Sequence, residues 1–323
     1  MTALRQCRGH LVREVPINEG DPSLAAVRDV DVLHVHRYAE EGVVGLARAA
    51  KAHGAAVVWD NDDDMGSVPR GTPGYRRQGG IMWERRLAGM RRLFGLADLV
   101  TAPSAHLAGR LREYGAQHAE VIENYVPDQF VLRSRPPREG VTIGWIAGLE
   151  HQIDAEQIPI RQTLQRLLDE RPEVRVVSFG LGLGLRSDRY RHVNVVPLLE
   201  LTRAAAVFDV GIAPLADIAM NQARSNIKCK EYAAAGACWL ASPIGPYTGL
   251  GEKQGGRLVP DDGWYEALVR LVERPKDRQK LARRASKWVA QQTLARRAGE
   301  WEDALAAAIE RAGRAASAAA PVA

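Results

Sequence analysis

The strongest constraint on the fold is a segment in the second half of the chain that predicts a strand, a loop and the start of a helix. Residues 207–214 (VFDVGIAP) have the apolar character of a buried strand, which ends at Pro214. The polar loop that follows leads to Ser225 and Asn226, either of which is a good helix N-cap. A buried strand that leads into a helix predicts an α/β protein with a ligand site at the carboxyl end of the strand.

Charged residues mark the first turns of this predicted helix. Arg224, Lys228 and Glu231 share one face, because residues three and four apart are neighbours on a helix. A helix N-terminus offers free N–H groups and a positive dipole end, so two cations beside it predict a diphosphate-binding site. Glu231 is placed to accept hydrogen bonds from hydroxyl groups such as those of a ribose. A solvated helix with an internal Lys228–Glu231 ion pair is the alternative.

The first half of the chain alternates between predicted strands and helices, as in a parallel sheet. No apolar strand with a glycine turn opens it, so the usual first strand of a Rossmann-like domain is either absent or upstream of residue 1. The expected strands are residues 12–17, 31–36, 55–59, 97–102 and 120–122. The expected helices are residues 4–11, 38–53, 81–96 and 105–114, the last capped by Ser104, and residues 65–80 are expected to form a mobile loop.

The second half continues the alternation after a polar, proline-rich stretch that predicts a linker. Its expected strands are residues 141–147, 174–179, 192–196, 207–214, 239–242 and 257–259, and its expected helices are residues 160–169, 261–273, 278–292 and 295–312. Residues 313–323 are expected to be frayed. The predicted organisation is a first domain over 1–132, a linker over 133–140, a second domain over 141–294, and a final helix and tail over 295–323 that cross back onto the first domain.

Composition limits the class of protein and its partners. The chain has 323 residues, of which 46% are hydrophobic and 26% charged, as in globular proteins. Its net charge of +5 suits an anionic ligand, a membrane surface or nucleic acid. No apolar run approaches membrane-spanning length and the N-terminus lacks a signal-peptide core, so we expect a cytoplasmic protein. The spacing of Cys7, Cys229 and Cys238 matches neither a disulfide framework nor a zinc site.

The run SNIKCKEYAAAG, preceded by VFDVGIAPL and followed by LASPIGPY, resembles the donor-site signature of the family-4 glycosyltransferases. The resemblance implies the GT-B fold, in which two Rossmann-like domains with parallel sheets face each other across a cleft. It also implies a retaining, metal-independent transfer of a sugar from a nucleotide diphosphate-sugar. Glu231 matches the second Glu of the family's Glu-x7-Glu motif, which binds ribose. Ala223 stands where the first Glu, which contacts the transferred sugar, would lie.

The resemblance gives roles to the residues around the donor diphosphate. Arg224, Lys228 and the N–H groups that follow Ser225 and Asn226 would stabilise the departing diphosphate. Gly148, at the end of the predicted strand 141–147, would let the backbone approach a phosphate closely. The Arg/Lys pair that the family usually carries after this strand is not evident, which leaves Arg224 and Lys228 to supply more of the positive charge.

Other residues are assigned to the donor sugar, the base and the acceptor. His151 would lie near the donor sugar in a catalytic role, and a structural role for this loop histidine is the alternative. Pro197 belongs to the segment that packs near the nucleotide base in the family. Residues at the strand ends of the first domain are expected to bind the acceptor, a small molecule or glycoconjugate. They are His36, Arg37 and Asp60, with Asp62 in a catalytic role.

The acidic run at residues 60–64 (DNDDD) admits three interpretations. Asp60, Asn61 and Asp62 have the form of the DxD motif that holds a divalent metal on the donor in GT-A glycosyltransferases, and carboxylates do bind Mg²⁺ or Mn²⁺. Helix N–H groups and cations already supply a diphosphate site here, so we expect acceptor binding and no metal. An acidic turn that caps the next helix is the structural alternative.

Three further functions were compared with glycosyl transfer. An inactive glycosyltransferase-like protein that binds nucleotide is consistent with Ala223. An NAD-dependent oxidoreductase is less favoured, because the glycine run at 180–184 (GLGLG) does not match the dinucleotide fingerprint. Nucleic-acid binding is not expected, because the basic residues are not interleaved with aromatic ones. The arginine-rich helix 81–96 is expected to pack on its own domain, with peripheral membrane contact as the alternative.

Overall fold

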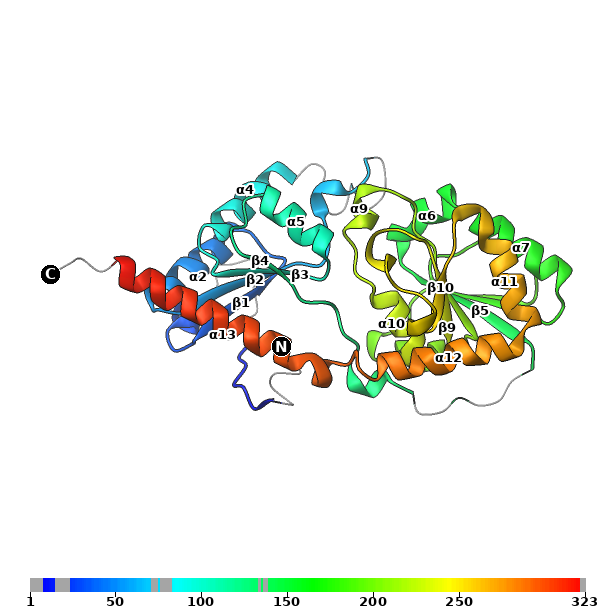
Figure 1. Ribbon diagram of the computed structural model, residues 1–323. Helices are drawn as coiled ribbons and strands as arrows, with labels where there is room; N and C mark the ends of the chain where they lie inside the picture. The colour runs from blue at the N-terminus through cyan, green and yellow to red at the C-terminus, as the bar shows by residue number, and fades with distance from the viewer. Residues whose placement is uncertain are drawn as a thin grey trace.

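The computed structural model describes residues 8–14, 24–70, 75, 83–132, 135 and 139–319. Figure 1 shows two lobes, each built on a parallel sheet, with the last helix lying along the first lobe. The fold is α/β, as the alternation in the sequence predicts.

The first sheet has four parallel strands in the order β1-β2-β3-β4. They are β1 (Val32–His36), β2 (Ala56–Asp60), β3 (Leu99–Ala102) and β4 (Ala119–Val121). Helices α2 (Glu41–Ala52), α4 (Trp83–Phe94) and α5 (Ala105–Glu113) pack on one face, where their apolar side chains meet Val35, Trp59 and Val100. Helix α5 begins where Ser104 Oγ accepts a hydrogen bond from the N–H of Leu107, as its sequence predicts.

The second sheet has six parallel strands in the order β10-β9-β8-β5-β6-β7. They are β5 (Val141–Ala147), β6 (Val174–Gly180), β7 (Tyr190–Val193), β8 (Val210–Ala213), β9 (Cys238–Ala241) and β10 (Gly256–Leu258). Helices α7 (Ile160–Glu170) and α11 (Trp264–Glu273) cover one face, and α8 (Leu201–Ala205) and α10 (Ile227–Ala234) cover the other. The remaining helices are α6 (Gln152–Gln157), α9 (Ala219–Gln222) and α12 (Pro275–Val289).

Short 3₁₀ helices connect many of these elements. They are η1 (Leu24–Val27), η2 (Met65–Ser67), η3 (Asp128–Phe130), η4 (Leu149–His151), η5 (Leu198–Glu200), η6 (Gly245–Tyr247), η7 (Glu252–Gln254) and η8 (Asp261–Gly263).

Strand β5 marks the point at which the strand order of the second sheet reverses. The chain runs outward from β5 to β6 and β7, and then returns to place β8 on the other side of β5. Loops that follow two such strands diverge to opposite faces and leave a crevice between them, which is where open α/β sheets bind ligands. The topology therefore directs attention to the loops that follow β5 and β8.

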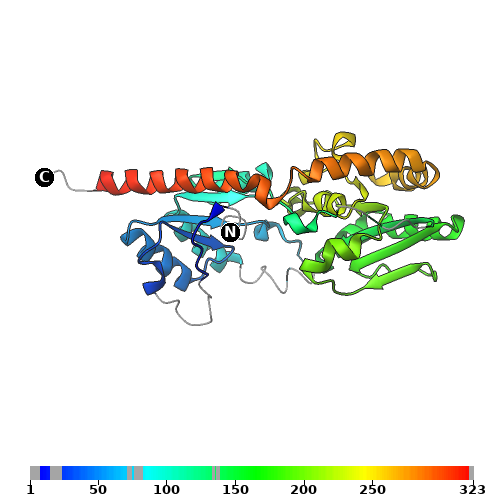
Figure 2. The same ribbon diagram turned by 90° about the horizontal axis from the view of Figure 1, so that it is seen from below.

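The last helix, α13 (Leu294–Ala319), belongs to the second half of the chain but packs on the first sheet. Its Ala304, Ala308 and Ala312 lie against Ala56 and Val58 of β2, on the face opposite to α2 and α5. Figure 2 shows α12 running over the second lobe and α13 over the first. The small alanine side chains let α13 approach the sheet closely.

Most expected elements are present, and two expectations need comment. Residues 313–319 are helical and not frayed, because α13 continues through an alanine-rich stretch of high helix propensity. Residues 9–14 lie in neither a helix nor a strand, while the rest of the expected helix 4–11 and strand 12–17, apart from residue 8, lies outside the described residues. Residues 65–67 of the expected loop 65–80 form η2, and most of its residues 71–80 lie outside the described residues, as does most of the expected linker 133–140.

Candidate active site in the interdomain cleft

The carboxyl edges of the two sheets face each other and are joined by hydrogen bonds. Ser104, which follows β3, donates from Oγ to the carbonyl oxygen of Ala223 at 3.0 Å. Asn124, which follows β4, donates from Nδ2 to Oγ of Ser225 at 3.1 Å. The strand ends of the first domain therefore meet the loop between β8 and α10, which is the segment that the sequence singles out.

A buried carboxylate joins the two loops at the strand-order reversal. Asp154, in the short helix α6 after β5, accepts hydrogen bonds from the N–H of Ala216 at 2.8 Å and from Nδ2 of Asn221 at 2.7 Å, both in the connection between β8 and α10. His151 Nδ1 lies 2.7 Å from its other oxygen. The side chain of Asp154 is fully buried, so this network fixes the two loops relative to each other.

His151 is held inside this network. Its ring is buried, meets Trp145 edge to face, and is bonded to Asp154. Burial lowers the pKa of His151, against the raising effects of Asp154 and Glu150, so the ring is neutral near pH 7. A neutral ring that donates to Asp154 is suited to orienting that carboxylate. The catalytic role expected for His151 stays a prediction.

Arg224 is the cation that the network positions. Its Nε donates to Oδ1 of Asn221 at 2.8 Å, so the guanidinium is oriented by an amide that Asp154 itself holds. Nη2 of Arg224 is buried and has no hydrogen-bond partner in the described part of the chain. An unpaired guanidinium N–H is costly to bury, so this position suits an anionic ligand that would accept from it.

The N-terminus of α10 is where the sequence predicts it. Asn226 occupies the N-cap position, but its side chain does not cap the helix and instead donates to Glu123 Oε2 at 3.2 Å, in the first domain. Ser225 likewise bonds across the cleft, to Asn124. Lys228 Nζ lies 3.1 Å from Oε2 of Glu231. The internal ion pair named as an alternative is therefore present, and it also keeps both groups at the start of the helix.

The loop after β5 brings an additional carboxylate to the site, which the sequence reasoning missed. A Cβ built on Gly148 would lie 2.1 Å from Oε2 of Glu150, so the missing side chain of the glycine leaves the space that this carboxylate occupies. Burial acts to raise the pKa of Glu150, but His151, a backbone hydrogen bond, Arg224 and Lys228 outweigh it and lower the pKa. The carboxylate of Glu150 thus packs against Gly148, close enough to Arg224 and Lys228 to be stabilised by their positive charges.

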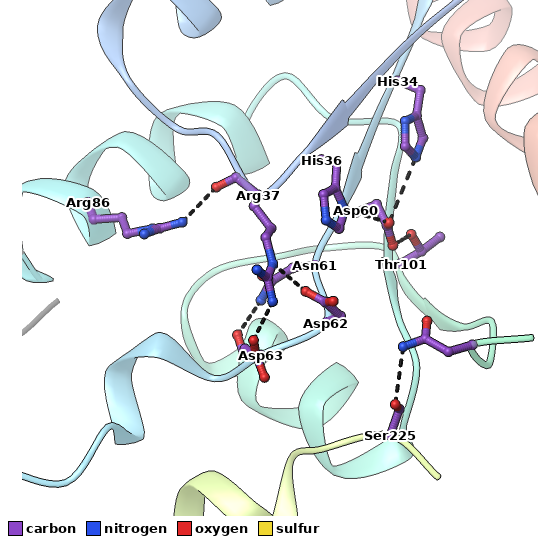
Figure 3. A network of polar contacts seen from close by, with 11 residues as sticks. His34, His36, Arg37, Asp60, Asn61, Asp62, Asp63, Arg86, Thr101 and Ser225 are labelled. Atoms are coloured by element: carbon purple, nitrogen blue, oxygen red, sulfur yellow. Dashed lines mark hydrogen bonds and ion pairs between the residues drawn. The ribbon is translucent and has the colours of Figure 1, made fainter. Parts of the chain in front are cut away.

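A row of polar side chains crosses the first sheet at its carboxyl edge (Figure 3). His36 Nδ1 lies 2.9 Å from Oδ2 of Asp60, and Thr101 Oγ1 donates to Oδ1 of Asp60 at 2.7 Å. Burial acts to raise the pKa of Asp60, but these hydrogen bonds and the neighbouring histidines lower it. The pKa of His36 is raised, chiefly by its hydrogen bond to Asp60. Asp60 is therefore an ionised carboxylate that supports His36.

Arg37 adopts a backbone conformation that non-glycine residues rarely take, with φ at 64°. Its guanidinium is paired with Asp62 and Asp63, and its carbonyl oxygen accepts from Nη2 of Arg86 at 3.0 Å. Burial and the charge of Asp63 raise the pKa of Asp62 despite this pairing. Strained backbone held by several contacts is typical of functional sites.

The acidic run therefore divides into groups with different partners. Asp60 faces His36, Asp62 and Asp63 face Arg37, and Asp64 is buried beneath them. Asp64 accepts from the N–H of Gly66 and so caps η2, which is the structural alternative proposed for this run. Among the described residues, no group of three or more His, Cys, Asp or Glu is arranged to hold a metal ion.

The cleft contains a cavity of about 310 Å³ beside the contacts between the domains. Such a volume is at the lower end of small-molecule sites. Ten residues line it: Pro103, Ser104, Ala105, His106, Val121, Glu123, Gln222, Asn226, Gly245 and Pro246. The sequence reasoning did not identify it, because its walls come from five separate segments of the two domains.

A buried lysine, also missed from the sequence, ties the two domains together below the cleft. Lys230 Nζ donates to Oε2 of Glu123 at 2.6 Å and to the carbonyl oxygen of Asn124 at 2.7 Å, and it lies 4.4 Å from the ring centroid of Tyr125. Tyr125 in turn donates to Glu300 of α13. The helix that carries Lys228 and Glu231 is thereby anchored to the first domain.

Pro197 lies apart from the groups described so far. It is exposed and precedes η5, beyond the edge strand β7. Val195, Leu198 and Leu199 around it are also exposed, with 67–80% of their surface accessible. The role expected for Pro197 near a nucleotide base stays a prediction.

Two domains with parallel sheets that face each other across a cleft, with a final helix returned to the first domain, form the arrangement known as the GT-B fold. Residues 19–130 match the family model described as Glycosyltransferase Family 4. The match covers about a third of the chain, within the first domain, and the two-domain architecture is the GT-B fold that the donor-site motif predicts.

Solved structures of glycosyltransferases share this fold. Anabaena HepE, solved in complex with UDP, has a TM-score of 0.63 and 13% identity, over 88% of this chain and 80% of that one. A UDP-forming α,α-trehalose-phosphate synthase from Burkholderia xenovorans has a TM-score of 0.62 and 15% identity, over 87% and 74%. Sucrose-phosphate synthase from Thermosynechococcus elongatus has a TM-score of 0.56 and 15% identity, over 90% and 74%. No curated protein sequence matches the chain.

None of the helices in the described ranges has the length and apolar character needed to span a bilayer.

Proposed function

We propose that this protein transfers a sugar from a nucleotide diphosphate-sugar to an acceptor in the interdomain cleft, with retention of anomeric configuration and without a metal. The observation that carries the proposal is the unpaired Nη2 of Arg224, buried at the strand-order reversal beside Lys228 and the Gly148 loop. Positive charge and free N–H groups at this crevice suit a diphosphate.

The chemistry needs positive charge at this position. Breaking the bond between the anomeric carbon and the diphosphate leaves negative charge on the departing group, and preorganised donors stabilise it without reorganisation. Arg224 would supply a guanidinium that Asn221 already orients, and Lys228 an ammonium in the first turn of α10. Gly148 would allow the backbone to approach a phosphate once Glu150 moves aside.

The remaining donor contacts follow from the same helix. Glu231 would accept hydrogen bonds from the ribose with the oxygen that Lys228 does not use. His151 would act indirectly, by orienting the network that ends at Arg224. HepE is solved with UDP and the Burkholderia synthase forms UDP, so UDP is the first nucleotide to test.

We place the acceptor at the first domain's edge of the cleft. His36, Arg37, Asp60 and Asp62 form ion pairs there that leave His36 half exposed, so hydroxyl groups of a small molecule or glycoconjugate could reach them. The strained backbone of Arg37 favours a ligand site over a purely structural turn. Asp62, with its raised pKa, would orient an acceptor hydroxyl.

A binding protein without transfer activity is the second candidate, and one observation favours it. Ala223 is completely buried and packs with the core of the first domain, so this chain has no carboxylate where the family places its sugar-contacting Glu. Nucleotide binding without turnover is what this candidate predicts.

Differential scanning fluorimetry with UDP, GDP, ADP, TDP and NAD tests the proposal. A ligand at 100 times its dissociation constant adds about 2.7 kcal/mol to the free energy of unfolding, an easily measured shift. We expect one nucleoside diphosphate to stabilise the wild type and to lose its effect in Lys228→Ala and Glu231→Ala. Stabilisation by none of them, or by NAD alone, would contradict the proposed donor site.

We further propose a cytoplasmic protein in which the arginine-rich helix α4 packs on its own domain, with peripheral membrane contact through α4 as the alternative. Its Met90, Leu93 and Phe94 are buried in the first domain, while Arg91 and Arg92 are exposed. Only electrostatic attraction to anionic lipid is then available, so binding should be weak and salt-dependent. Sedimentation with phosphatidylglycerol vesicles, with Arg91→Glu as the comparison, measures it.

A further inference from the structure

Three neighbouring strands of the first sheet end in side chains that bond to one another. His36 of β1 is the register partner of Asp60 of β2, and Asp60 is the register partner of Thr101 of β3. Because side chains of paired residues point to the same face, the three groups form a continuous row on the side of the sheet that α13 covers. The row is fixed by the backbone of the sheet, which makes it more rigid than a loop site.

The hydrogen bonds determine the tautomer of His36. The carboxylate of Asp60 can only accept, so Nδ1 of His36 carries the proton and donates it across 2.9 Å. Nε2 then has a free lone pair, and it has no hydrogen-bond partner in the ranges that the structure describes. With half of its side chain exposed, His36 presents this lone pair to a ligand.

The row lies on the edge of the first sheet that faces the donor domain. The ends of the next two strands bond to that domain, through Ser104 to Ala223 and through Asn124 to Ser225. Figure 3 shows Ser225, at the start of the donor helix, below the row that His36, Asp60 and Thr101 form. An acceptor bound at this edge would have the histidine on one side and the donor helix on the other.

We propose that His36 is the catalytic base of the transfer, a role that rests on the proposed function and goes beyond binding of the acceptor. Nε2 removes the proton of the acceptor hydroxyl, and Asp60 and Thr101 are positioning residues. A carboxylate that orients an imidazole and stabilises its protonated form is an established arrangement for a base.

The step balances without any other reactant. The acceptor oxygen forms a bond to the anomeric carbon on the face from which the diphosphate departs, so the configuration is retained, while its proton passes to Nε2 and the bond from the anomeric carbon to the diphosphate oxygen breaks. The diphosphate leaves with the electron pair of that bond, and the imidazolium releases its proton to water after the product departs. No change of oxidation state occurs.

The charges around His36 determine how the step depends on pH. The hydrogen bond and charge of Asp60 and the charge of Asp62 favour its protonated form, whereas partial burial and Arg37 oppose it, and the net effect raises its pKa. The neighbouring His34, whose pKa is lowered to about 4, is neutral over this range. A base must be unprotonated, so the rate should rise with pH through this pKa. Asp60→Asn removes the main stabilising partner, lowers the pKa and should move this rise to lower pH.

The test measures nucleotide release from the glucose ester of whichever nucleoside diphosphate stabilises the protein, with water and then with azide as nucleophile. Water must lose a proton as it attacks, whereas the azide ion has none to lose. We expect His36→Gln to slow the reaction with water roughly 100-fold, within the usual range for a general base, and to change the azide reaction less than about threefold. The rise with pH should disappear in the same variant.

Controls separate this inference from the proposed function. His53→Gln, which alters an exposed histidine after α2, should behave as wild type. Equal losses with water and azide, or no loss with water, would overturn the role of His36 as a base. If the wild type binds the nucleotide but releases none with either nucleophile, the base and the transfer activity are both overturned while the donor site stands. If no nucleoside diphosphate binds, the proposed function itself fails.

Discussion

The two sides of the cleft hold their polar groups in different ways. On the donor side, Asp154 is fully buried and collects hydrogen bonds from both loops at the strand-order reversal, so Arg224 is oriented by a chain of contacts. On the first domain's side, His36 and Arg37 are paired with carboxylates at an exposed edge. Buried networks are rigid and costly to break, whereas exposed ion pairs contribute little to stability.

The difference suggests a division of labour. In the proposed function, an invariant part of the donor, its diphosphate, would be matched to preorganised charge, while the acceptor would meet groups that can adjust. Substitutions on the donor side should therefore cost stability or binding. Substitutions on the acceptor side should cost turnover or alter pH dependence, with a smaller effect on folding.

Lys228→Met gives the largest expected effect. The variant loses the ammonium that would stabilise the departing diphosphate, and removal of one such group typically costs about 100- to 1,000-fold in turnover. Steady-state kinetics with the identified sugar nucleotide would measure kcat, and fluorimetry would report nucleotide binding. The exposed Lys276→Met is the matched control. Unchanged turnover in Lys228→Met would show that Lys228 does not stabilise the departing diphosphate, and the proposed contrast between the two sides of the cleft would fail.

Asp154→Ala tests whether the donor side is held by its buried network. The substitution leaves His151 and Asn221 buried without their shared acceptor, and breaking a buried charged network costs about 3 kcal/mol. Urea denaturation would measure the free energy of unfolding, and nucleotide affinity should fall because Asn221 no longer orients Arg224. The exposed Asp169→Ala should cost less than about 0.5 kcal/mol. Similar losses of unfolding free energy in both variants would show that the buried network around Asp154 contributes no more to stability than an exposed carboxylate does.

His34 gives the first domain's side a testable pH dependence. Burial lowers the pKa of His34 from 6.5 to about 4, despite the opposing charge of Asp60. The unfolded chain therefore binds more protons between these values, and stability should fall as the pH falls from 6.5 to 4, by about 2 kcal/mol. His34→Phe, which keeps the edge-to-face contact with Trp301, should remove this part of the loss.

Denaturation curves at several pH values would measure the effect of His34. The exposed His118→Gln should retain the wild-type pH dependence. If His34→Phe loses stability over the same range as the wild type, acid sensitivity comes from other groups, and the edge of the first domain is less tightly packed than the structure indicates.

The sequence predicted the backbone of both sides better than the partners of their side chains. Apolar runs located β5 to within its observed bounds, and the N-cap signal located the start of α10. Local patterns cannot show which distant groups meet, so Asp154 and Asn221, separated by 67 residues, were not recognised. Lys230 was hidden for the same reason, because its role depends on Glu123 in the other domain.

The acidic run 60–64 shows what alternation could and could not resolve. Its position at the end of β2 was predicted, and so was its proximity to His36. The run does not act as a unit, however, because its side chains point in different directions. Asp60, at the end of the strand, is bonded to His36, whereas in the following turn Asp62 is paired with Arg37 and Asp64 is buried. Sequence motifs of three residues cannot express such a change of direction.

Glu150→Gln gives the smallest expected effect and has the opposite sign. The carboxylate lies on Gly148 within the field of Arg224 and Lys228, where the diphosphate would bind, so the ligand must compete with it for the same cations. Neutralising one like charge at a partly exposed site should tighten nucleotide binding by about threefold to tenfold, or roughly 1 kcal/mol. Isothermal titration with the nucleoside diphosphate would measure the change.

Glu156→Gln is the matched control for Glu150→Gln, because Glu156 is exposed on α6 and bonds only Gln152 among the contacts of the described residues. Its affinity should equal that of the wild type. The predicted gain should also shrink at high salt, since screening weakens the repulsion that the substitution removes. A weaker affinity in Glu150→Gln would instead mean that Glu150 holds the donor sugar, and the donor side would then supply the carboxylate that Ala223 lacks.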